Sequence, residues 1–347
     1  MESPVNELRT DWLTGRSVFV AENRALRPNE FSHESHDGEP ASAGGQPTKA
    51  TRVPSCPFCA GNESRTPPAV YETRDQHGDW QLRVVPNMFP AVNFPDLGGL
   101  AVVATDQLPP NFTAPIAGPH EVIVESRQHL IQLSDLTKPQ LRDVLECYAE
   151  RLRHWRNDGH YRYGIVFKNQ GPRAGASLAH LHSQLIALPF VPELVAAEGR
   201  RAAESYAKHK VCPYCQVVAK ERSAGSRVVS DQDGFIAFCP NVSWQPFEIW
   251  IMPVDHQPSF EHVERARLAR LGDFLHAIVS RLESVIPDAA YNMLLRTTPW
   301  TGESNDSSHW RLELLPRINS FAGLEIGTGI HINPVPPECA ALRLRTR

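Results

Sequence analysis

Residues 179–189 read AHLHSQLIALP, and the organisation of the whole chain can be worked out from them. The alternation is that of a β-strand, which places His180, His182 and Gln184 on one face and Leu181 and Leu185 on the other. Two histidines on one strand face have two interpretations. They indicate either a site that uses imidazole chemistry or a half-buried strand that carries them by chance.

A glycine-interrupted loop, FKNQGPRAGAS, precedes this strand at residues 167–177. Its glycines permit sharp turns that bring backbone N–H groups close to an anion. A loop of phosphate-binding type that leads into a histidine-bearing strand indicates phosphorus chemistry with a histidine nucleophile. A half-buried strand that carries the two histidines by chance remains the alternative at this point.

The composition is typical of a globular protein with two domains or one large duplicated unit. Of the 347 residues, 41% are hydrophobic and 21% are charged. A formal net charge of −4 predicts neither nucleic acid nor an anionic membrane as a partner. There is no long apolar run, and residues 1–4 lack signal-peptide character, which predicts a cytoplasmic protein.

The first half predicts a strand–helix–strand unit. Strands are expected at residues 80–85, 121–125 and 163–167. A helix capped by Ser134 or Asp135 is expected before the last of these strands. The apolar residues at helical spacing are Leu141, Val144, Tyr148, Leu152 and Trp155.

The amino-terminal segment combines a turn at Thr14-Gly15, a short strand and two arginines. Arg24 and Arg27 share a face if they lie on a helical turn, and two guanidiniums suit a diphosphate. Paired arginines that are only solvated are the alternative. Residues 29–52 are rich in Ser, Gly and Pro and predict a flexible loop.

The second half repeats the order of the first. CPYC at 212–215 corresponds to CPFC at 56–59, and residues 291–295 correspond to residues 163–167. A second amphipathic helix is expected through Leu268, Leu271, Leu275, Ile278 and Leu282. The chain is therefore predicted to be a tandem duplication of one unit.

Each copy carries two cysteines and two histidines in the same order. Two thiolates and two imidazoles form a closed tetrahedral zinc set. A single Cys-x-x-Cys pair is also compatible with chance or redox chemistry, but its repetition with both histidines favours two structural zinc sites. The predicted ligand sets are Cys56, Cys59, His129 and His180, and Cys212, Cys215, His256 and His309.

The duplication also separates a catalytic histidine from the ligands. The counterpart of His182 in the second copy is Arg311, and the counterpart of Gln184 is Glu313. If His180 and its counterpart both bind metal, His182 is the residue left for catalysis.

Four elements carry a resemblance: segment 13–28, the Pro86-Asn87 turn, block 169–184 and tail 323–329. On these the chain resembles the galactose-1-phosphate uridylyltransferase family, the transferase branch of the histidine-triad superfamily. Hydrolases of the superfamily usually carry a third histidine where this chain has Gln184, which favours the transferase branch. The uridylyltransferase motif has proline where this chain has Leu181, which leaves the substrate open.

The resemblance implies an α+β fold of tandem duplicated histidine-triad-like units, with antiparallel sheets and one main helix per unit. Residues 1–195 would form the half with the catalytic histidine and one zinc site. Residues 196–347 would form the half with the second zinc site and no nucleophile.

The resemblance also implies ping-pong nucleotidyl transfer, in which His182 attacks the α-phosphorus of a nucleotide sugar and a sugar 1-phosphate later takes the nucleotide. Gln184, Ser177 and backbone amides near Gly175 would bind the phosphoryl group. The other substrate-binding residues that it implies are Asn87 and Asn169 at the nucleotide and its phosphates, Arg24 and Arg27 at phosphate across a homodimer interface, and Glu325 near the hexose.

The donor has two interpretations. UDP-glucose:hexose-1-phosphate uridylyl transfer, a reaction of galactose metabolism, is favoured because that branch is common. The full second Cys-Cys-His-His set, together with residues 327–329 and 332–334, is also similar to ADP-glucose phosphorylases, which transfer adenylyl. A zinc-stabilised binding protein with a vestigial nucleophile is the alternative of another class, and a histidine-triad hydrolase is disfavoured by Gln184.

Overall fold

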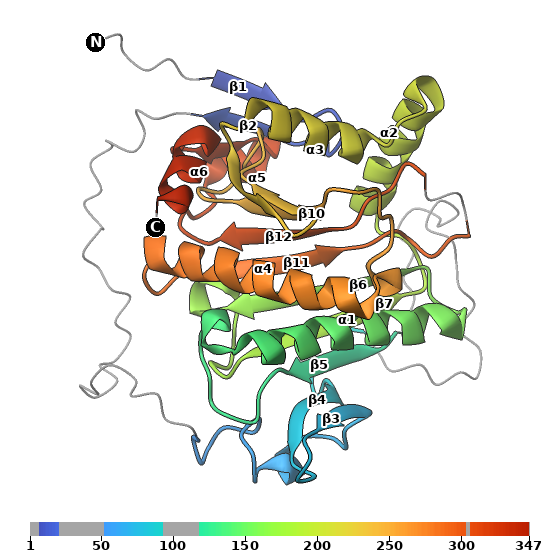
Figure 1. Cartoon of the computed structure of the whole chain (residues 1–347), viewed down its shortest axis with the longest axis vertical. Coiled ribbons are helices and arrows are strands. Elements are labelled where there is room, and N and C mark those ends of the chain that lie inside the picture. Colours follow the sequence, from blue (N-terminus) through green and yellow to red (C-terminus); the bar gives the residue numbers. More distant parts are fainter. Residues whose placement is uncertain (1–6, 21–51, 93–117, 303–305, 347) are drawn as a thin grey trace.

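The computed structural model describes residues 7–20, 52–92, 118–302 and 306–346. Its main feature is one ten-stranded sheet in which every neighbouring pair of strands is antiparallel (Figure 1). From edge to edge the strands are β3 (Tyr71–Arg74), β4 (Trp80–Pro86), β5 (His120–Val124), β7 (His182–Leu188), β6 (Tyr163–Gln170), β11 (Tyr291–Arg296), β12 (Arg311–Pro316), β10 (Ile249–Pro253), β9 (Phe235–Phe238) and β8 (Val228–Gln232).

The two halves of the chain meet in the middle of this sheet. Strands β6 and β11 pair with Gln170 opposite Tyr291 and Val166 opposite Leu295. The predicted α+β class is confirmed, and the duplication is built into one continuous sheet rather than into two separate sheets. A continuous sheet leaves no exposed strand edge between the two units.

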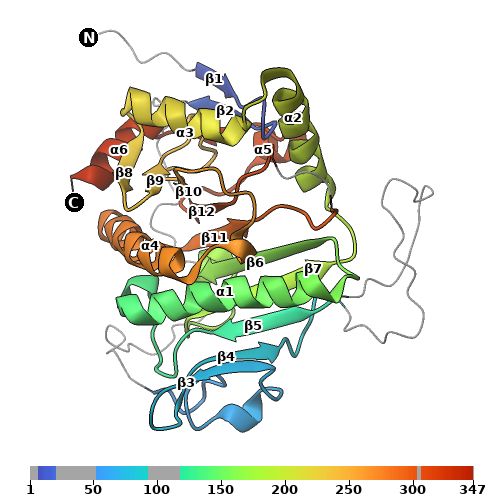
Figure 2. The same ribbon diagram turned by 45° about the vertical axis from the view of Figure 1, so that its right-hand side comes forward.

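Two long helices, α1 (Lys138–Asp158) and α4 (Arg265–Val285), lie side by side across one face of the sheet (Figure 2). They are the two predicted amphipathic helices. A Cβ atom on Gly272 would lie 2.8 Å from Cγ of Arg142, so glycine permits their close approach. Their apolar faces and the facing sheet residues form one hydrophobic core that spans both halves. Burial of this core is the main favourable term in folding.

The start of α1 differs from the prediction. Thr137 is the N-cap, and it forms a capping box in which its backbone N–H donates to Oε1 of Gln140 at 2.9 Å. Ser134 and Asp135 lie instead in a preceding 3₁₀ turn, η4 (Leu133–Asp135). The expected cap was wrong because the reciprocal Thr–Gln pair satisfies the first N–H groups of the helix.

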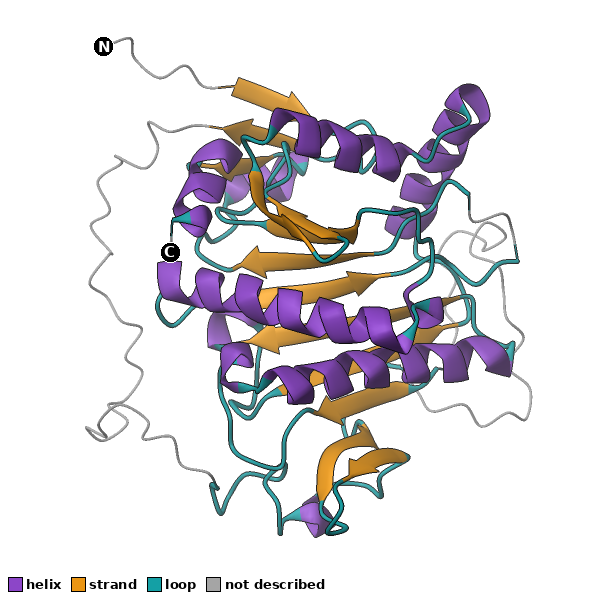
Figure 3. Ribbon diagram, viewed as in Figure 1, coloured by secondary structure: helices purple, strands orange, loops and turns teal. Residues whose placement is uncertain are grey.

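Helices α2 (Glu193–His209) and α3 (Pro213–Ala224), which were not predicted, lie at the second-half end of the molecule (Figure 3). They pack against the sheet face that points away from α1 and α4. Their apolar residues form a second core with Leu13 and Trp250. The corresponding face of the first half carries a smaller cluster around Trp80 and Val122, beside the CPFC turn. This face is therefore more open in the first half than in the second.

The amino-terminal strands belong spatially to the second half. β1 (Glu7–Thr10) pairs antiparallel with β2 (Ser17–Val20), and β2 pairs parallel with β13 (His331–Asn333). The predicted turn between them is present, with Gly15 at φ +74°. The remaining elements are the 3₁₀ turns η2 (Glu63–Arg65), η5 (Pro172–Ala174) and η6 (Phe260–His262) and the helices α5 (Gly323–Thr328) and α6 (Pro337–Arg345).

Two predictions concern residues that the structure does not describe. The arginine pair, Arg24 and Arg27, and the predicted loop up to residue 51 lie outside the described residues. The division at residues 195 and 196 stays a prediction. Among the helices that are described, none combines the length and apolar character needed to cross a membrane.

Candidate active site

A cavity of about 350 Å³ opens beside β4, β5 and β7 of the first half. It lies on the sheet face opposite the shared core, because Val85 and Val122 of its wall belong to the separate cluster beside the CPFC turn. Four of the predicted site residues line it, namely Asn87, Ser177, His182 and Gln184. Residues far apart in the sequence are thus brought to one place.

His182 is held in a defined tautomer. Its Nδ1 lies 2.7 Å from the backbone oxygen of His180. A carbonyl oxygen can only accept, so Nδ1 carries the proton and Nε2 of the neutral ring has a free lone pair. Burial lowers the pKa of His182, which favours the neutral ring. A buried, neutral imidazole on a cavity wall is suited to nucleophilic attack.

The main chain of His182 is anchored from the opposite side of the sheet. The buried ammonium of Lys168 donates to the His182 carbonyl at 3.0 Å and to Oε2 of Glu125 at 2.6 Å. Tyr148 of α1 donates to the other oxygen of Glu125 at 2.9 Å. These contacts connect the strand that carries the imidazole to the helix behind it.

One expectation about this stretch was wrong: β7 begins at His182, so His180 precedes the strand. The N–H of Leu181 donates to Leu130 at 2.9 Å, and the His180 ring turns toward the cysteines of the first half. The regular ladder starts only where β7 pairs with β5 and β6, with His182 opposite Val124.

The glycine loop has the turns that were predicted, with Gly171 at φ +78° and Gly175 at φ +88°. The N–H of Gly175, however, donates to the oxygen of Pro172 at 3.0 Å. Asn169 accepts a hydrogen bond from Asn292 of the second half at 2.9 Å and does not line the cavity. The roles of Gly175 and Asn169 stay predictions.

Glu325 is not brought to the cavity within one chain. It lies in α5, which Figure 1 shows at the second-half end of the molecule, and its carboxylate accepts from the N–H of Ala322 at 2.9 Å. Hydrogen bonds from backbone N–H groups lower its pKa against the opposing effect of burial. Its predicted contact with a hexose stays untested.

Polar residues that were not predicted also lie at this site, among them Arg65 and His120. Arg65, an exposed cation, lines the cavity and donates to the oxygen of Ser55 at 3.0 Å. His120, at the start of β5, lies 2.8 Å from Oε1 of Gln184. The signal for His120 was its alternation with Val122, whose side chain lines the same cavity.

All four predicted ligands of the first half come together directly beside His182. Their ligand atoms lie within 4.8 Å of one another. His180 presents Nδ1 to Cys56 Sγ at 3.5 Å, while its Nε2 lies 2.8 Å from the oxygen of Ser126. That carbonyl requires a proton on Nε2 and leaves Nδ1 free to bind a metal, as in many metal-ligating histidines. The donor set therefore fits a tetrahedral cation.

The second set forms an equivalent cluster. His309 presents Nδ1 to Cys215 Sγ at 3.6 Å, and its Nε2 lies 3.1 Å from the oxygen of Pro253. Its surroundings differ, since Cys212 is the N-cap of α3 whereas the first pair lies in a turn. The same ligand chemistry is thus built on two local structures.

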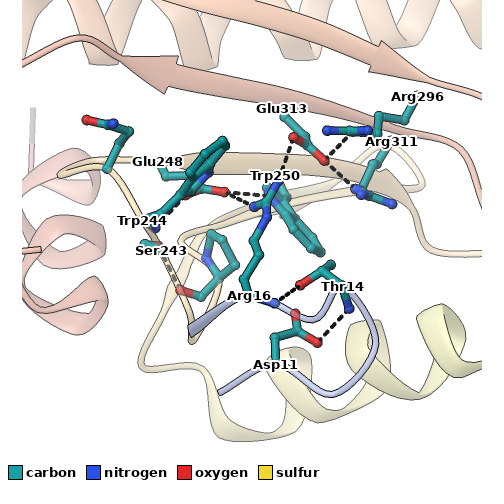
Figure 4. A network of polar contacts seen from close by, with 12 residues as sticks. Asp11, Thr14, Arg16, Ser243, Trp244, Glu248, Trp250, Arg296, Arg311 and Glu313 are labelled. Carbon is teal, nitrogen blue, oxygen red and sulfur yellow. Dashed lines mark hydrogen bonds and ion pairs between the residues drawn. The ribbon is translucent and has the colours of Figure 1, made fainter. Parts of the chain in front are cut away.

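Arg311 and Glu313 occupy the β12 positions that correspond to His182 and Gln184 (Figure 4). Arg311 is paired with Glu198 of α2 at 2.8 Å and with Glu313 at 2.7 Å. Arg16 reaches Glu313 at 3.2 Å from the amino-terminal turn. Buried ion pairs and α2 occupy most of the place that corresponds to the first-half cavity, and a cavity of only about 50 Å³ remains there.

The fold is of the histidine-triad type, duplicated along one chain. A family model described as galactose-1-phosphate uridyl transferase, N-terminal domain, matches residues 2–192, and one for a domain of unknown function, DUF4921, matches residues 100–346. The chain belongs to the galactose-1-phosphate uridylyltransferase family.

Relatives within the family carry two different names. An ADP-glucose phosphorylase of Arabidopsis thaliana is 33% identical over 99% of this chain and 94% of its own length. A galactose-1-phosphate uridylyltransferase of Thermotoga maritima is 27% identical over 65% of this chain and 73% of its own length.

Solved structures show the same likeness. An ADP-glucose phosphorylase from Arabidopsis thaliana with bound ADP-glucose superposes with a TM-score of 0.81 at 30% identity, over 99% of both chains. A uridylyltransferase superposes with a TM-score of 0.70 at 27% identity, over 99% of this chain and 98% of that one. Members of this family are nucleotidyltransferases, and this chain is an enzyme of that family.

Proposed function

We propose that this enzyme transfers a nucleoside monophosphate from a nucleotide sugar to a phosphate-bearing acceptor through a nucleotidyl intermediate on His182. One observation carries the proposal: Nδ1 of His182 donates to the oxygen of His180, which frees Nε2 in a cavity lined by Gln184 and Ser177. A binding protein would have no use for a nucleophile prepared in this way.

The reaction proceeds in two displacement steps at the same phosphorus. The Nε2 lone pair forms a bond to the α-phosphorus, and the bond from that phosphorus to the bridging oxygen breaks, so that the sugar 1-phosphate leaves. An oxygen of the acceptor phosphate then attacks the same phosphorus, and the phosphorus–nitrogen bond breaks. The Nδ1 proton stays on the ring throughout, stabilised by the His180 carbonyl.

Side chains around the cavity would stabilise the transferring phosphoryl group. Gln184 and Ser177 supply hydrogen-bond donors, and Asn87 would contact the nucleotide. We propose Asn169 and the backbone near Gly175 as further contacts of the substrate phosphates. Because Glu325 is remote from the cavity of its own chain, a role at the hexose requires a second copy, and we propose a homodimer in which Arg24 and Arg27 also act across the interface.

The degree of similarity favours an adenylyl donor. An ADP-glucose phosphorylase of Arabidopsis thaliana is 33% identical over 99% of this chain, whereas the uridylyltransferase of Thermotoga maritima is 27% identical over 65% of it. We therefore propose ADP-glucose as the donor and phosphate as the acceptor. The uridylyl reaction expected from the sequence, with UDP-glucose and a hexose 1-phosphate, is the competing outcome.

Zinc is the metal we propose for both clusters. Two thiolates and two imidazoles complete a tetrahedron and leave no open position for substrate, so the sites would be structural. None of the seven cysteines forms a disulfide, which agrees with the expected cytoplasmic location. A bound zinc ion would supply only a rigid anchor for His180, beside the nucleophile.

Intact-mass measurement of the zinc-loaded protein with each donor tests this function. ADP-glucose should leave an acid-labile adduct of adenylyl mass that phosphate discharges, and His182→Ala should show no adduct. An adduct of uridylyl mass, discharged by galactose 1-phosphate, would reverse the donor assignment. Binding of both donors without any adduct would show a binding protein, and release of free nucleotide without an acceptor would show a hydrolase.

A further inference from the structure

His120 connects two walls of the cavity. It is 6% exposed, and its backbone oxygen accepts from the N–H of Asn87 at 2.7 Å. Its ring lies between the segment that follows β4 and the side chain of Gln184 on β7. None of the reaction steps described above uses this buried imidazole.

The hydrogen bonds of His120 define its tautomer. The N–H of Ala91 donates to Nδ1 at 3.0 Å, so Nδ1 is an unprotonated acceptor. In the neutral ring the proton is therefore on Nε2, which lies 2.8 Å from Oε1 of Gln184 and donates to it. Burial lowers the pKa of His120, in agreement with a neutral ring.

The Asn87 carboxamide lies close to the same pair. Its orientation is set because the N–H of Phe89 donates to Oδ1 of Asn87 at 2.9 Å, and its nitrogen lies 3.1 Å from Nε2 of His120 and 3.5 Å from Oε1 of Gln184. Because Nε2 of His120 carries the proton, the Asn87 nitrogen can donate only to Oε1 of Gln184, at the outer limit of a hydrogen bond. A flipped Gln184 carboxamide would place its NH₂ group against the N–H of His120 and replace that hydrogen bond by a donor–donor contact.

We propose that His120 is a positioning residue for the transfer reaction: it fixes the Gln184 carboxamide with Oε1 toward itself and the NH₂ group toward the cavity. The proposal rests on the proposed function, because the NH₂ group is the donor that a transferring phosphoryl group needs. Among the described residues, no hydrogen bond engages Nε2 of Gln184, which leaves this nitrogen for a ligand.

Three substitutions separate this role from simple anchoring of the cavity wall. His120→Phe keeps a ring and removes both hydrogen bonds. His120→Gln carries an NH₂ group at the position of Nε2 and can donate to Gln184. His120→Asn carries an oxygen at the position of Nδ1 and can accept only from Ala91. The measured quantity is the single-turnover rate of adduct formation on His182 with saturating donor.

We expect His120→Phe to slow adduct formation about 10- to 100-fold, the range found when an orienting partner is removed. His120→Gln should recover most of the rate, and His120→Asn should not. In a Gln184→Ala background, His120→Phe should cause little further loss, because both act through one carboxamide. Rescue by Asn rather than Gln, or additive losses in the double variant, would overturn the proposal.

A measurement without turnover keeps this proposal distinct from the proposed function. Long-range proton–nitrogen NMR of the histidine rings should show unprotonated Nδ1 and protonated Nε2 for His120, with Nε2 shifted by Gln184→Ala. Protonated Nδ1 would overturn the proposal even if adducts form. If the wild-type protein forms no adduct, the proposed function fails, and the inference that depends on it fails with it, whatever the tautomer.

Discussion

Nδ1 of His182 donates to the backbone oxygen of His180, whose own ring lies in the first metal cluster. The side chain that would bind metal and the carbonyl that orients the candidate nucleophile thus belong to one residue. Phe58 of the CPFC turn also packs against both rings, with centroid distances of 5.9 Å to His180 and 5.3 Å to His182. The cluster and the nucleophile are therefore coupled at close range.

His182→Ala should abolish the nucleotidyl adduct and leave both zinc ions bound. The reason is that His182 is not among the ligand atoms of either cluster. Intact mass and zinc content measured on the same sample check this outcome. Loss of one zinc equivalent from the variant would contradict the assignment of His180 as the ligand and His182 as the nucleophile.

Loss of the two metals should have different effects on adduct formation. Cys59→Ala should lose one zinc and slow the transfer strongly, because its cluster includes His180. Cys212→Ala is the matched control, since its cluster lies in the other half. This variant should lose one zinc and stability while the folded fraction retains its rate. Equal rate losses per folded protein in the two variants would show that proximity to His182 does not matter.

Lys168→Met should destabilise the fold by about 3–5 kcal/mol, the usual effect of removing one partner from a buried ion pair. Glu125, which is 1% exposed, would then keep an unpaired carboxylate. Urea unfolding measures the loss, and the double variant Lys168→Met with Glu125→Gln should recover part of it. A single variant as stable as the wild-type protein would contradict the contribution of this pair.

The buried carboxyl of Glu248 should make stability depend on pH near neutrality. Burial raises its pKa to about 7, although Arg16 lies 2.8 Å away and opposes the rise; nearby Glu313 adds to it. The folded state therefore binds more protons than the unfolded state between about pH 4.5 and pH 7. Stability should fall as pH rises through this window, by up to about 3 kcal/mol.

Glu248→Gln provides the comparison, because glutamine does not titrate. The free energy of unfolding of the wild-type protein, relative to this variant, should decrease from pH 5 to pH 8. Chemical denaturation at each pH measures the difference. A difference that is constant over this range would show that Glu248 is ionised throughout, as an ideal ion pair with Arg16 would make it.

Much of the site could be predicted because a duplicated chain provides an internal comparison. The repeated Cys-x-x-Cys pairs and the histidines that follow them allowed both ligand sets to be assigned, and the structure brings each set together. Arg311 stands at the second-half position that corresponds to His182, and this difference separated the candidate nucleophile from the candidate ligands. The two main helices followed from apolar residues at helical spacing, which depends only on local geometry.

Other features could not be predicted because they depend on contacts between distant segments. Helices α2 and α3 cover the second-half face, where Glu198 of α2 pairs with Arg311 of the sheet. The placement of the amino-terminal strands against β13 has no local signal. The start of β7 at His182 follows from hydrogen bonds that connect Leu181 to Leu130.

The sequence alone determined which residue types are available for chemistry: two Cys₂His₂ sets, one unmatched histidine and the glutamine that follows it. Only the tertiary structure decided the protonation of the rings, because each tautomer is set by a partner elsewhere. The backbone oxygen of His180 sets the tautomer of His182. The backbone oxygens of Ser126 and Pro253 set the tautomers of His180 and His309, and the N–H of Ala91 sets that of His120. Hydrogen bonds of this kind are directional, so they depend on the position of atoms in the fold rather than on spacing along the chain.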